Sequence, residues 1–406
     1  MMKKLKMIIL GYGQRGGIYG NYAFTYPEKY EVVAVVDCRE ARLEIAKEQF
    51  DCPVFKDYKS MLEANIEADF VAVATQDEQH EEHAIACMEK GYDLLLEKPI
   101  SNSVEGCRHI YEVACKHDRK VIVCHVLRYS PFYKRVKEIL DSGELGDIIT
   151  IHASENVGFY HQAHSFVRGP WRNKAQSSPM ILAKCCHDMD IFRWLVGKKC
   201  KTVASMGGLR IFKKENAPEG SADFCSDCNV DCIYKAQKLY TDKGKSGFSA
   251  YFCNDNSSDE KILKALTHTQ YDRCIFKCDN DVVDHQVSIM QFEDDITVNH
   301  TMTAFSKEIY RDIKIHGTKA ELVGVMEKNY IEIRPFDGEV RTITWEDNIS
   351  VGGHSGGDEG MMGDVYLAFN GQVTGGVTFI DVSIDSHLMS FAAEESRLQG
   401  GQVVEI

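Results

Sequence analysis

The first 125 residues alternate short apolar runs with amphipathic stretches, and this alternation constrains the fold more than any other feature. The apolar runs lie at residues 7–10, 32–36, 70–74, 92–96 and 121–124. Helical patterns occupy residues 41–50, 58–66, 81–90 and 104–117. Apolar strands that alternate with helices indicate a parallel sheet covered on both faces. We therefore predict a doubly wound α/β domain over residues 1–125.

A glycine-rich turn follows the first apolar run. Gly11, Gly13 and Gly16 have the spacing at which the first glycine makes a tight turn, the second lets the backbone approach a pyrophosphate and the third allows close helix–strand packing. Gln14 and Arg15 begin the next helix, whose N–H groups and dipole attract phosphates. The turn therefore predicts a dinucleotide site.

Three further positions fit the same site. Asp37 ends the second run, where a carboxylate accepts bonds from ribose hydroxyls and repels a 2′-phosphate, so NAD is favoured over NADP. Thr75 ends the third run at the ligand-binding edge of the sheet. His80 either lines the cofactor groove or caps the next helix at the surface.

Residues 126–406 have a different pattern of apolar and polar residues. Helices are predicted from Pro131 to Gly143, at 180–196 and at 384–399. Strand-like alternation occurs at 283–292, 297–304, 312–316, 320–325 and 330–334. Runs of strands joined by short loops predict an α+β domain with a large, mostly antiparallel open sheet. The polar, irregular stretch 213–259 is predicted to be an insertion.

Glu97-Lys98-Pro99 directly follows the fourth apolar run. A glycine turn after the first strand and a lysine after a later one place an amine near the dinucleotide. That arrangement suits hydride transfer to or from an alcohol carbon.

The chain resembles the glucose–fructose oxidoreductase / inositol dehydrogenase / MocA family over nearly its whole length. The resemblance rests on the glycine turn, Asp37, Glu97-Lys98-Pro99, Trp171-Arg172 and the runs at 184–190 and 392–396. It implies a Rossmann domain, a second domain with an open sheet, and NAD(P)-dependent oxidation or reduction of a sugar, cyclitol or polyol. A few members of the family use the cofactor transiently in glycoside cleavage.

The resemblance also implies that Lys98 reaches the substrate hydroxyl and the nicotinamide, and that His187 is the acid/base partner. Two positions depart from the family pattern: Gln76 stands where the family often has proline, and Ala183 stands where inositol dehydrogenase-like members have aspartate. Recognition of a polyol in the manner of those members is therefore not expected.

The chemistry of these side chains agrees with that role. A histidine that titrates near neutrality can take the hydroxyl proton, and an ammonium group stabilises the developing alkoxide. Lys184 and His187, three residues apart, share one helix face and are both catalytic candidates. Core packing is the alternative role for an isolated histidine in such a helix.

Two pairs are candidates for substrate contact. Arg128-Tyr129 and Trp171-Arg172 could hold hydroxyls or a carboxylate, or flank the nicotinamide. The alternative is a salt bridge or stacking pair at a domain interface. The loop 354–358 either closes over a sugar or forms a plain surface turn.

The sequence contains fifteen cysteines, and six of them lie between residues 225 and 278. Cys225, Cys228 and Cys232, together with Cys253, Cys274 or Cys278, could supply four thiolates for a structural zinc ion. A loose group of thiols on an insertion is the alternative. Catalytic zinc is not expected, because Lys98 and His187 already provide an electrophile and a base.

The amino-acid composition argues against several classes of binding partner. A formal charge of −14 argues against nucleic acid and anionic lipid, and no apolar run is long enough to cross a bilayer. The basic start lacks the apolar length of an export signal, and free thiols favour a reducing cytoplasm. The open sheet needs a cover, which predicts a homodimer or homotetramer.

We therefore predict an NAD-dependent dehydrogenase or reductase of a sugar or sugar derivative. An NAD-assisted glycoside hydrolase and a non-catalytic NAD-binding regulator are the alternatives.

Overall fold

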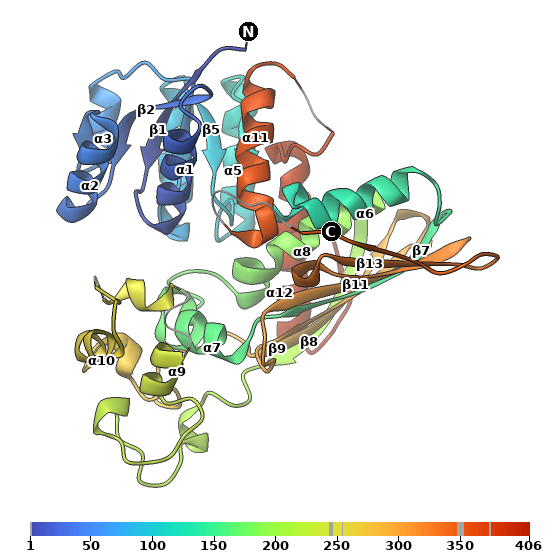
Figure 1. Cartoon of the computed structure of the whole chain (residues 1–406). Helices are drawn as coiled ribbons and strands as arrows, with labels where there is room; N and C mark the ends of the chain where they lie inside the picture. Colours follow the sequence, from blue (N-terminus) through green and yellow to red (C-terminus); the bar gives the residue numbers. More distant parts are fainter. Residues whose placement is uncertain (1, 243–246, 254, 347–352, 373–374) are drawn as a thin grey trace.

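The computed structural model describes residues 2–242, 247–253, 255–346, 353–372 and 375–406. Two β-sheets and one largely irregular module make up the chain (Figure 1). The first sheet is six-stranded in the order β3-β2-β1-β4-β5-β6, and all its pairs are parallel. Its strands are β1 (Leu5–Leu10), β2 (Tyr30–Val36), β3 (Val54–Phe55), β4 (Phe70–Val73), β5 (Asp93–Leu96) and β6 (Val121–Val123). The predicted doubly wound Rossmann sheet is confirmed.

Five helices of the first 125 residues cover this sheet. They are α1 (Gln14–Thr25), α2 (Glu40–Phe50), α3 (Tyr58–Glu63), α4 (His80–Glu89) and α5 (Val104–Lys116). Because β1 lies between β2 and β4, the order in which the strands are added to the sheet reverses at β1, and such a reversal opens a crevice at the carboxyl ends of these strands. The glycine turn, Asp37 and Thr75 follow these three strand ends.

The second sheet has nine strands in the order β14-β13-β12-β11-β7-β10-β9-β8-β15. All its pairs are antiparallel except β7 with β10, which confirms the mostly antiparallel open sheet. The strands are β7 (Ile148–Asn156), β8 (Cys200–Gly208), β9 (His285–Phe292), β10 (Thr297–Thr303), β11 (Tyr310–Gly317), β12 (Ala320–Val325), β13 (Tyr330–Pro335), β14 (Arg341–Thr344) and β15 (Val404–Glu405). Helices of this half of the chain are α6 (Pro131–Asp141), α7 (Phe159–His161), α8 (Met180–Val196), α9 (Ala236–Asp242), α10 (Asp259–Leu266), α11 (Gly357–Phe369) and α12 (Ile380–Leu398).

Helix α8 carries the predicted histidine into the interior. It spans the predicted residues and ends at Gly197, whose φ of 74° a side chain would disfavour. Almost all of its residues are buried, and it packs against α12. Since α12 also contacts α5, the two helices connect the second sheet to the nucleotide domain.

The C-terminal segment returns to the first domain. Met361, Met362 and Val365 of α11 belong to the core around β1, and Ile380 and Ile384 of α12 pack on the opposite face of that sheet. The predicted division at residue 125 assigned all of this segment to the second domain. A helical pattern identifies a buried face, but it does not identify the neighbour that buries it.

A separate module, residues 209–284, lies between β8 and β9. It has its own small core, which includes Phe212, Tyr240, Leu266 and Tyr271. The module occupies the lower left of Figure 1, below the nucleotide domain. It is larger than the predicted insertion at 213–259, because aromatic residues beyond that stretch complete its core.

Within the described ranges, no helix combines the length and the apolar character that a membrane span requires.

Candidate functional site

The glycine turn has the shape of a phosphate cradle. A Cβ atom on Gly11, at φ +95°, would lie 2.5 Å from the Ala74 carbonyl oxygen, and one on Gly16 would lie 2.0 Å from that of Gly11. At Gly13 the space is open, with only the Arg39 guanidinium 3.6 Å from such an atom. Gly13 precedes α1 without a side-chain cap, so the first N–H groups of that helix point toward the turn. These residues fit a dinucleotide.

Asp37 is buried at the end of β2 and is held in place. Its carboxylate accepts hydrogen bonds from the Tyr12 amide and from the Nε and Nη2 of Arg39, each at 2.9 Å. Burial raises the pKa of Asp37, but the bonds and charge of Arg39 outweigh that effect and hold the pKa below its usual value. Arg39 was not singled out from the sequence. Its position two residues after the carboxylate that is predicted to bind ribose could have identified it as a residue near the adenosine.

Arg15 links the cradle to the rest of the molecule. Its guanidinium contacts buried Glu97 at 2.5 Å and buried Asp358 at 2.8 Å. Glu97 also accepts a bond from Tyr19. These contacts fix Arg15 and Glu97 in an ionic cluster next to the glycine turn.

Asp358 also changes the interpretation of the loop at 354–358. Its side chain is 1% exposed and accepts hydrogen bonds from the Gly353 amide and His354 Nδ1 at 2.8 and 3.1 Å. The loop is therefore not a plain surface turn, and its acidic residue ties α11 to the glycine turn.

Lys98 and His187 meet at α8. Lys98 Nζ donates to the Ala183 carbonyl oxygen at 2.9 Å, and Ala183 lies one helical turn before His187. Burial depresses the pKa of His187 well below 6.5, and the Lys98 charge is the next largest cause. The imidazole is therefore neutral at neutral pH, below the near-neutral titration expected from the sequence, and its Nδ1 has no hydrogen-bond partner.

Other histidines surround this pair. The rings of His125 and His354 lie 5.8 and 5.9 Å from that of His187, centroid to centroid. Burial lowers the pKa values of His125 and His161 well below 6.5, and the Lys98 charge lowers both further. The sequence did not identify any of these histidines individually as a site residue, because they come from distant segments.

Lys184 lies on the same helix and has a buried partner. Its Nζ lies 3.4 Å from Glu155 of β7, whose side chain is fully buried. Arg311 joins Glu155 to Asp188, with its Nε 2.9 Å from the Asp188 carboxylate. Lys184 is therefore fixed at the edge of the histidine group by an ionic network that reaches into the second sheet.

A pocket of ≈ 450 Å³ opens between the nucleotide domain, the second domain and the module. The residues that line it are Gln76, Asp77, Glu78, Pro170, Trp171, Arg172, Gln176, Ser177 and Gln270. Burial raises the pKa of Asp77, and the charges of His80 and Lys98 and a hydrogen bond from Trp171 counter this only in part. The predicted pair Trp171-Arg172 thus faces a carboxyl group that the sequence did not single out.

Family models match both halves of the chain. The "oxidoreductase family, NAD-binding Rossmann fold" model of Gfo/Idh/MocA proteins matches residues 5–125, and the "oxidoreductase family, C-terminal alpha/beta domain" model matches residues 137–351. The chain belongs to the Gfo/Idh/MocA oxidoreductase family. The resemblance stated from the motifs is confirmed.

Two relatives differ in sequence identity to this chain and in the share of the chain that they cover. The putative oxidoreductase YteT of Bacillus subtilis is 25% identical over 363 residues, which cover 83% of this chain and 82% of YteT. Inositol 2-dehydrogenase 2 of Saccharopolyspora erythraea is 30% identical over 199 residues, or 48% of this chain and 55% of the relative. The chain therefore spans only about half the length of that dehydrogenase.

Solved structures show the same fold over the full length. Levoglucosan dehydrogenase, in complex with NADH and levoglucosan, matches with a TM-score of 0.74 at 16% identity and covers 100% of this chain and 99% of that one. Scyllo-inositol dehydrogenase of Lactobacillus casei, with NAD(H) and scyllo-inositol, matches with a TM-score of 0.67 at 18% identity and covers 99% of both chains.

Four residues that were predicted to bind the substrate or the cofactor form hydrogen bonds with other residues of the protein. Arg128 forms two hydrogen bonds with buried Asp190, at 2.6 and 2.7 Å, and is 3% exposed. The Tyr129 hydroxyl bonds to Thr378 at 2.7 Å and is also buried. We leave this pair out of the proposed substrate site, because the contacts match the interface alternative.

The other two lie beside the groove. His80 is 0% exposed, and its ring nitrogens lie 2.7 and 3.2 Å from the carbonyl oxygens of Pro99 and Thr75. His80 therefore fastens the Lys98 segment to the end of β4 and neither lines the groove nor caps a helix at the surface. Thr75 Oγ1 bonds to His83 at 3.0 Å.

Proposed function

We propose that the protein is an NAD-dependent dehydrogenase or reductase that acts on a secondary alcohol or ketone carbon of a sugar or related polyol. The observation that carries this proposal is the meeting of Lys98 and His187 at α8, beside a glycine turn shaped for a dinucleotide. Relatives of this family that act on inositol and levoglucosan support the substrate class.

The residues divide the chemistry between them. Gly11, Gly13, Gln14 and Gly16 would hold the pyrophosphate, and Asp37 would hold the adenosine ribose. A nicotinamide bound there supplies the acceptor for the hydride. Lys98 stabilises the negative charge that develops on the substrate oxygen. The neutral imidazole of His187 takes the hydroxyl proton, so the alcohol leaves as a ketone with one hydride and one proton removed.

The pocket supports a polyhydroxylated substrate. Trp171 offers an apolar face, while Asp77, Gln176 and Ser177 supply polar groups for several hydroxyls. We assign Trp171 and Arg172 to substrate or nicotinamide contact on this basis. Lys184 of α8 is paired with Glu155 and is not among the residues that line this pocket.

Asp37 supports NAD in preference to NADP. A 2′-phosphate would meet a carboxylate whose pKa is held low and which is therefore ionised at neutral pH. All fifteen cysteines are free, which supports a reducing, cytoplasmic compartment.

One contact favours a second candidate, an NAD-assisted glycoside hydrolase. The Tyr251 hydroxyl of the module donates to Gln14 Oε1 in the glycine turn at 2.8 Å. A module fastened there would slow the exchange of a bound dinucleotide. A retained cofactor suits a cycle in which a ring carbon is oxidised, the aglycone is eliminated, water is added and the alcohol is restored, with no net NADH.

Turnover assays separate these functions. The purified protein is offered NAD with a panel of sugars, inositols and glycosides, while NADH absorbance and products are followed together. Net NADH with a ketone product supports the dehydrogenase. Released aglycone without net NADH supports the hydrolase, and no turnover of any panel member would favour the non-catalytic regulator.

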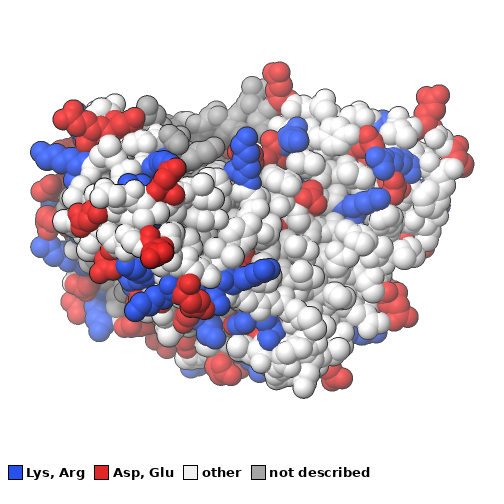
Figure 2. All heavy atoms as spheres, turned by 90° about the horizontal axis from the view of Figure 1, so that it is seen from below, with Lys and Arg blue, Asp and Glu red and all other residues white. Residues whose placement is uncertain are grey.

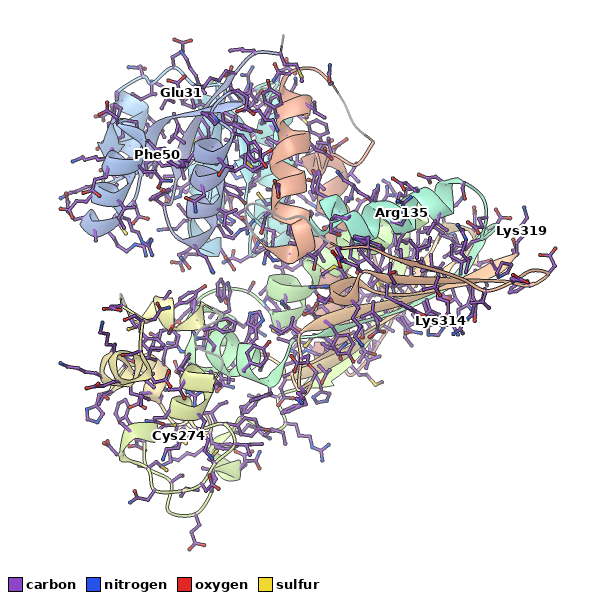
Figure 3. The ribbon with its side chains drawn as sticks, viewed as in Figure 1. Glu31, Phe50, Arg135, Cys274, Lys314 and Lys319 are labelled. Carbon is purple, nitrogen blue, oxygen red and sulfur yellow. The ribbon has the colours of Figure 1, made fainter. Side chains whose placement is uncertain are left out.

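Variants then test the assigned residues. Lys98→Met and His187→Asn should each lower kcat by about 10²–10⁴-fold, the usual contribution of a positioned acid or base. Lys319→Ala is the control, because Lys319 lies at the far tip of the second domain (Figure 3). A variant of either site residue that keeps full kcat, with the protein folded by circular dichroism, would contradict the assignment.

A further inference from the structure

Four cysteines of the module line one cavity outside the proposed catalytic site. Cys225, Cys228, Cys232 and Cys274 all line one small, mainly apolar cavity of ≈ 20 Å³. A cavity of this size has room for about one water-sized atom. Figure 3 shows Cys274 in the lower lobe, away from the nucleotide domain. The proposed dehydrogenase chemistry uses none of these residues.

A buried arginine beside the thiols has no anionic partner. Arg168 is fully buried, and its Nε and Nη2 donate to the Arg273 and Tyr234 carbonyl oxygens at 2.8 and 3.0 Å. Nη2 also lies 3.8 Å from Cys225 Sγ, and Nη1 has no hydrogen-bond partner. No carboxylate among the described residues forms an ion pair with Arg168. A buried cation without a counter-charge is costly, so the arrangement calls for negative charge at the sulfurs.

We propose that the module binds one Zn²⁺ through the thiolates of Cys225, Cys228, Cys232 and Cys274, with Arg168 as the buried counter-charge. Four thiolates and one Zn²⁺ carry a net charge of −2. Arg168 contributes +1, and Lys235, which also lines the cavity and donates to the Cys228 carbonyl oxygen at 2.6 Å, contributes the other +1. The site is then electrically balanced.

The sulfurs must move together to bind the ion. In the described part of the chain, only Cys185, Asp188 and His300 bring three ligand atoms within 4.8 Å of one another. Zinc–sulfur bonds of about 2.3 Å place tetrahedral sulfurs roughly 3.8 Å apart. Three of the four thiols lie between Phe224 and Tyr234, a stretch with one short 3₁₀ turn, and the proposal requires side-chain rotation and small loop shifts there. Each thiol loses its proton as it binds.

The remaining candidates fit less well. Cys253 Sγ faces the Asp255 carbonyl oxygen at 3.1 Å, and Cys278 Sγ faces that of Cys274 at 3.4 Å. In the group of Cys185, Asp188 and His300, the Asp188 carboxylate is already neutralised by Arg311 at 2.9 Å. The four cysteines that share one cavity lining are therefore the ligand set that we propose.

A zinc ion would stabilise this part of the protein. The module has a small core and only short helices, and such units commonly depend on metals or crosslinks. Because Tyr251 of the module contacts the glycine turn, the ion would also help to hold the module against the cofactor groove.

Elemental analysis of the full chain, purified under reducing conditions, tests the proposal. We expect about one zinc per chain, with no iron or acid-labile sulfide. Cys225→Ser/Cys274→Ser should remove most of the zinc, whereas the control Cys38→Ser/Cys115→Ser, at two exposed thiols, should keep it. Absence of zinc, zinc unchanged in the double variant, or iron with sulfide would overturn the proposal.

Cobalt substitution provides a readout that does not depend on a variant folding. Wild-type protein reconstituted with Co²⁺ should show the intense charge-transfer absorption of thiolate ligands, and Zn²⁺ should displace it. Arg168→Met should weaken zinc binding by at least about tenfold in a chelator competition, because two negative charges then face only Lys235. A cobalt spectrum without thiolate bands, or an unchanged affinity in a folded Arg168→Met protein, would contradict the site.

Discussion

At the scale of single residues, we propose that Asp37 and Arg39 together set the cofactor preference. The Asp37 carboxylate accepts two hydrogen bonds of 2.9 Å from the Arg39 guanidinium, and in the proposed function it presents negative charge to the adenosine ribose. Loss of the carboxylate would remove the repulsion and release a cation beside the ribose. A 2′-phosphate would then meet the arginine instead of the aspartate.

Asp37→Ser should therefore raise the ratio of kcat/KM for NADP to that for NAD by at least about tenfold. Steady-state kinetics with both cofactors measures the ratio. Glu44→Ser, an exposed change on α2 of the same domain, is the control and should leave the ratio unchanged. An unaltered ratio in Asp37→Ser would show that the ribose binds elsewhere.

In the proposed function, His187 determines the acidic limb of the pH profile. The oxidation requires the imidazole in its neutral form, and the folded protein lowers its pKa well below 6.5 through burial and the Lys98 charge. Activity is lost as pH falls through the pKa of a base, so the loss should occur below pH 6.5. The measurement is kcat/KM for the alcohol against pH, and a His187-dependent limb at or above 6.5 would contradict the assignment.

Sequence reasoning succeeded at the residue scale where the signal is local. The glycine spacing, Asp37 after β2 and the end of α8 at Gly197 depend on neighbours a few residues away, and the structure places them as predicted. For Arg128 the decisive contact is not local. Its partner Asp190 lies 62 residues away, so no local pattern distinguished an interface ion pair from a substrate-binding arginine.

At the scale of elements, the module and the glycine turn are joined by Tyr251. This residue ends the short helix Phe248–Tyr251, whose position depends on the packing of the module core. The sequence identified an insertion but gave no sign that it folds back on the first βα turn, since Gln14 and Tyr251 are 237 residues apart.

Tyr251→Phe should weaken NAD binding by about two- to tenfold, because one hydrogen bond contributes about 0.5–1.5 kcal/mol. Loss of that bond loosens the cover over the cofactor, so the dissociation rate should rise more than the association rate falls. Stopped-flow fluorescence measures both rates. Tyr330→Phe, on the second sheet, is the control, and equal behaviour of the two variants would show that the module does not hold the cofactor.

At the scale of the whole molecule, the second sheet leaves one face open. Alternate residues of β9 are exposed, and Met206 and Ile289 are 64% and 57% exposed although they lie within strands. In Figure 2 the central part of the right-hand half is mainly uncharged, while charged side chains lie along its edges. Exposed apolar patches of this kind mark protein interfaces, and we propose that a second copy covers this one in a homodimer or homotetramer.

Met206→Glu/Ile289→Glu should therefore split the oligomer. Two buried charges at an apolar contact cost several kcal/mol, which is enough to dissociate a dimer at micromolar concentration. Size-exclusion chromatography with light scattering should show the mass fall to that of one chain, 45.9 kDa. Phe24→Glu, an equally exposed apolar position on α1, should leave the mass unchanged, because the nucleotide domain is not part of this face. A wild-type protein that is already monomeric, or a double variant with the wild-type mass, would exclude the sheet as the interface.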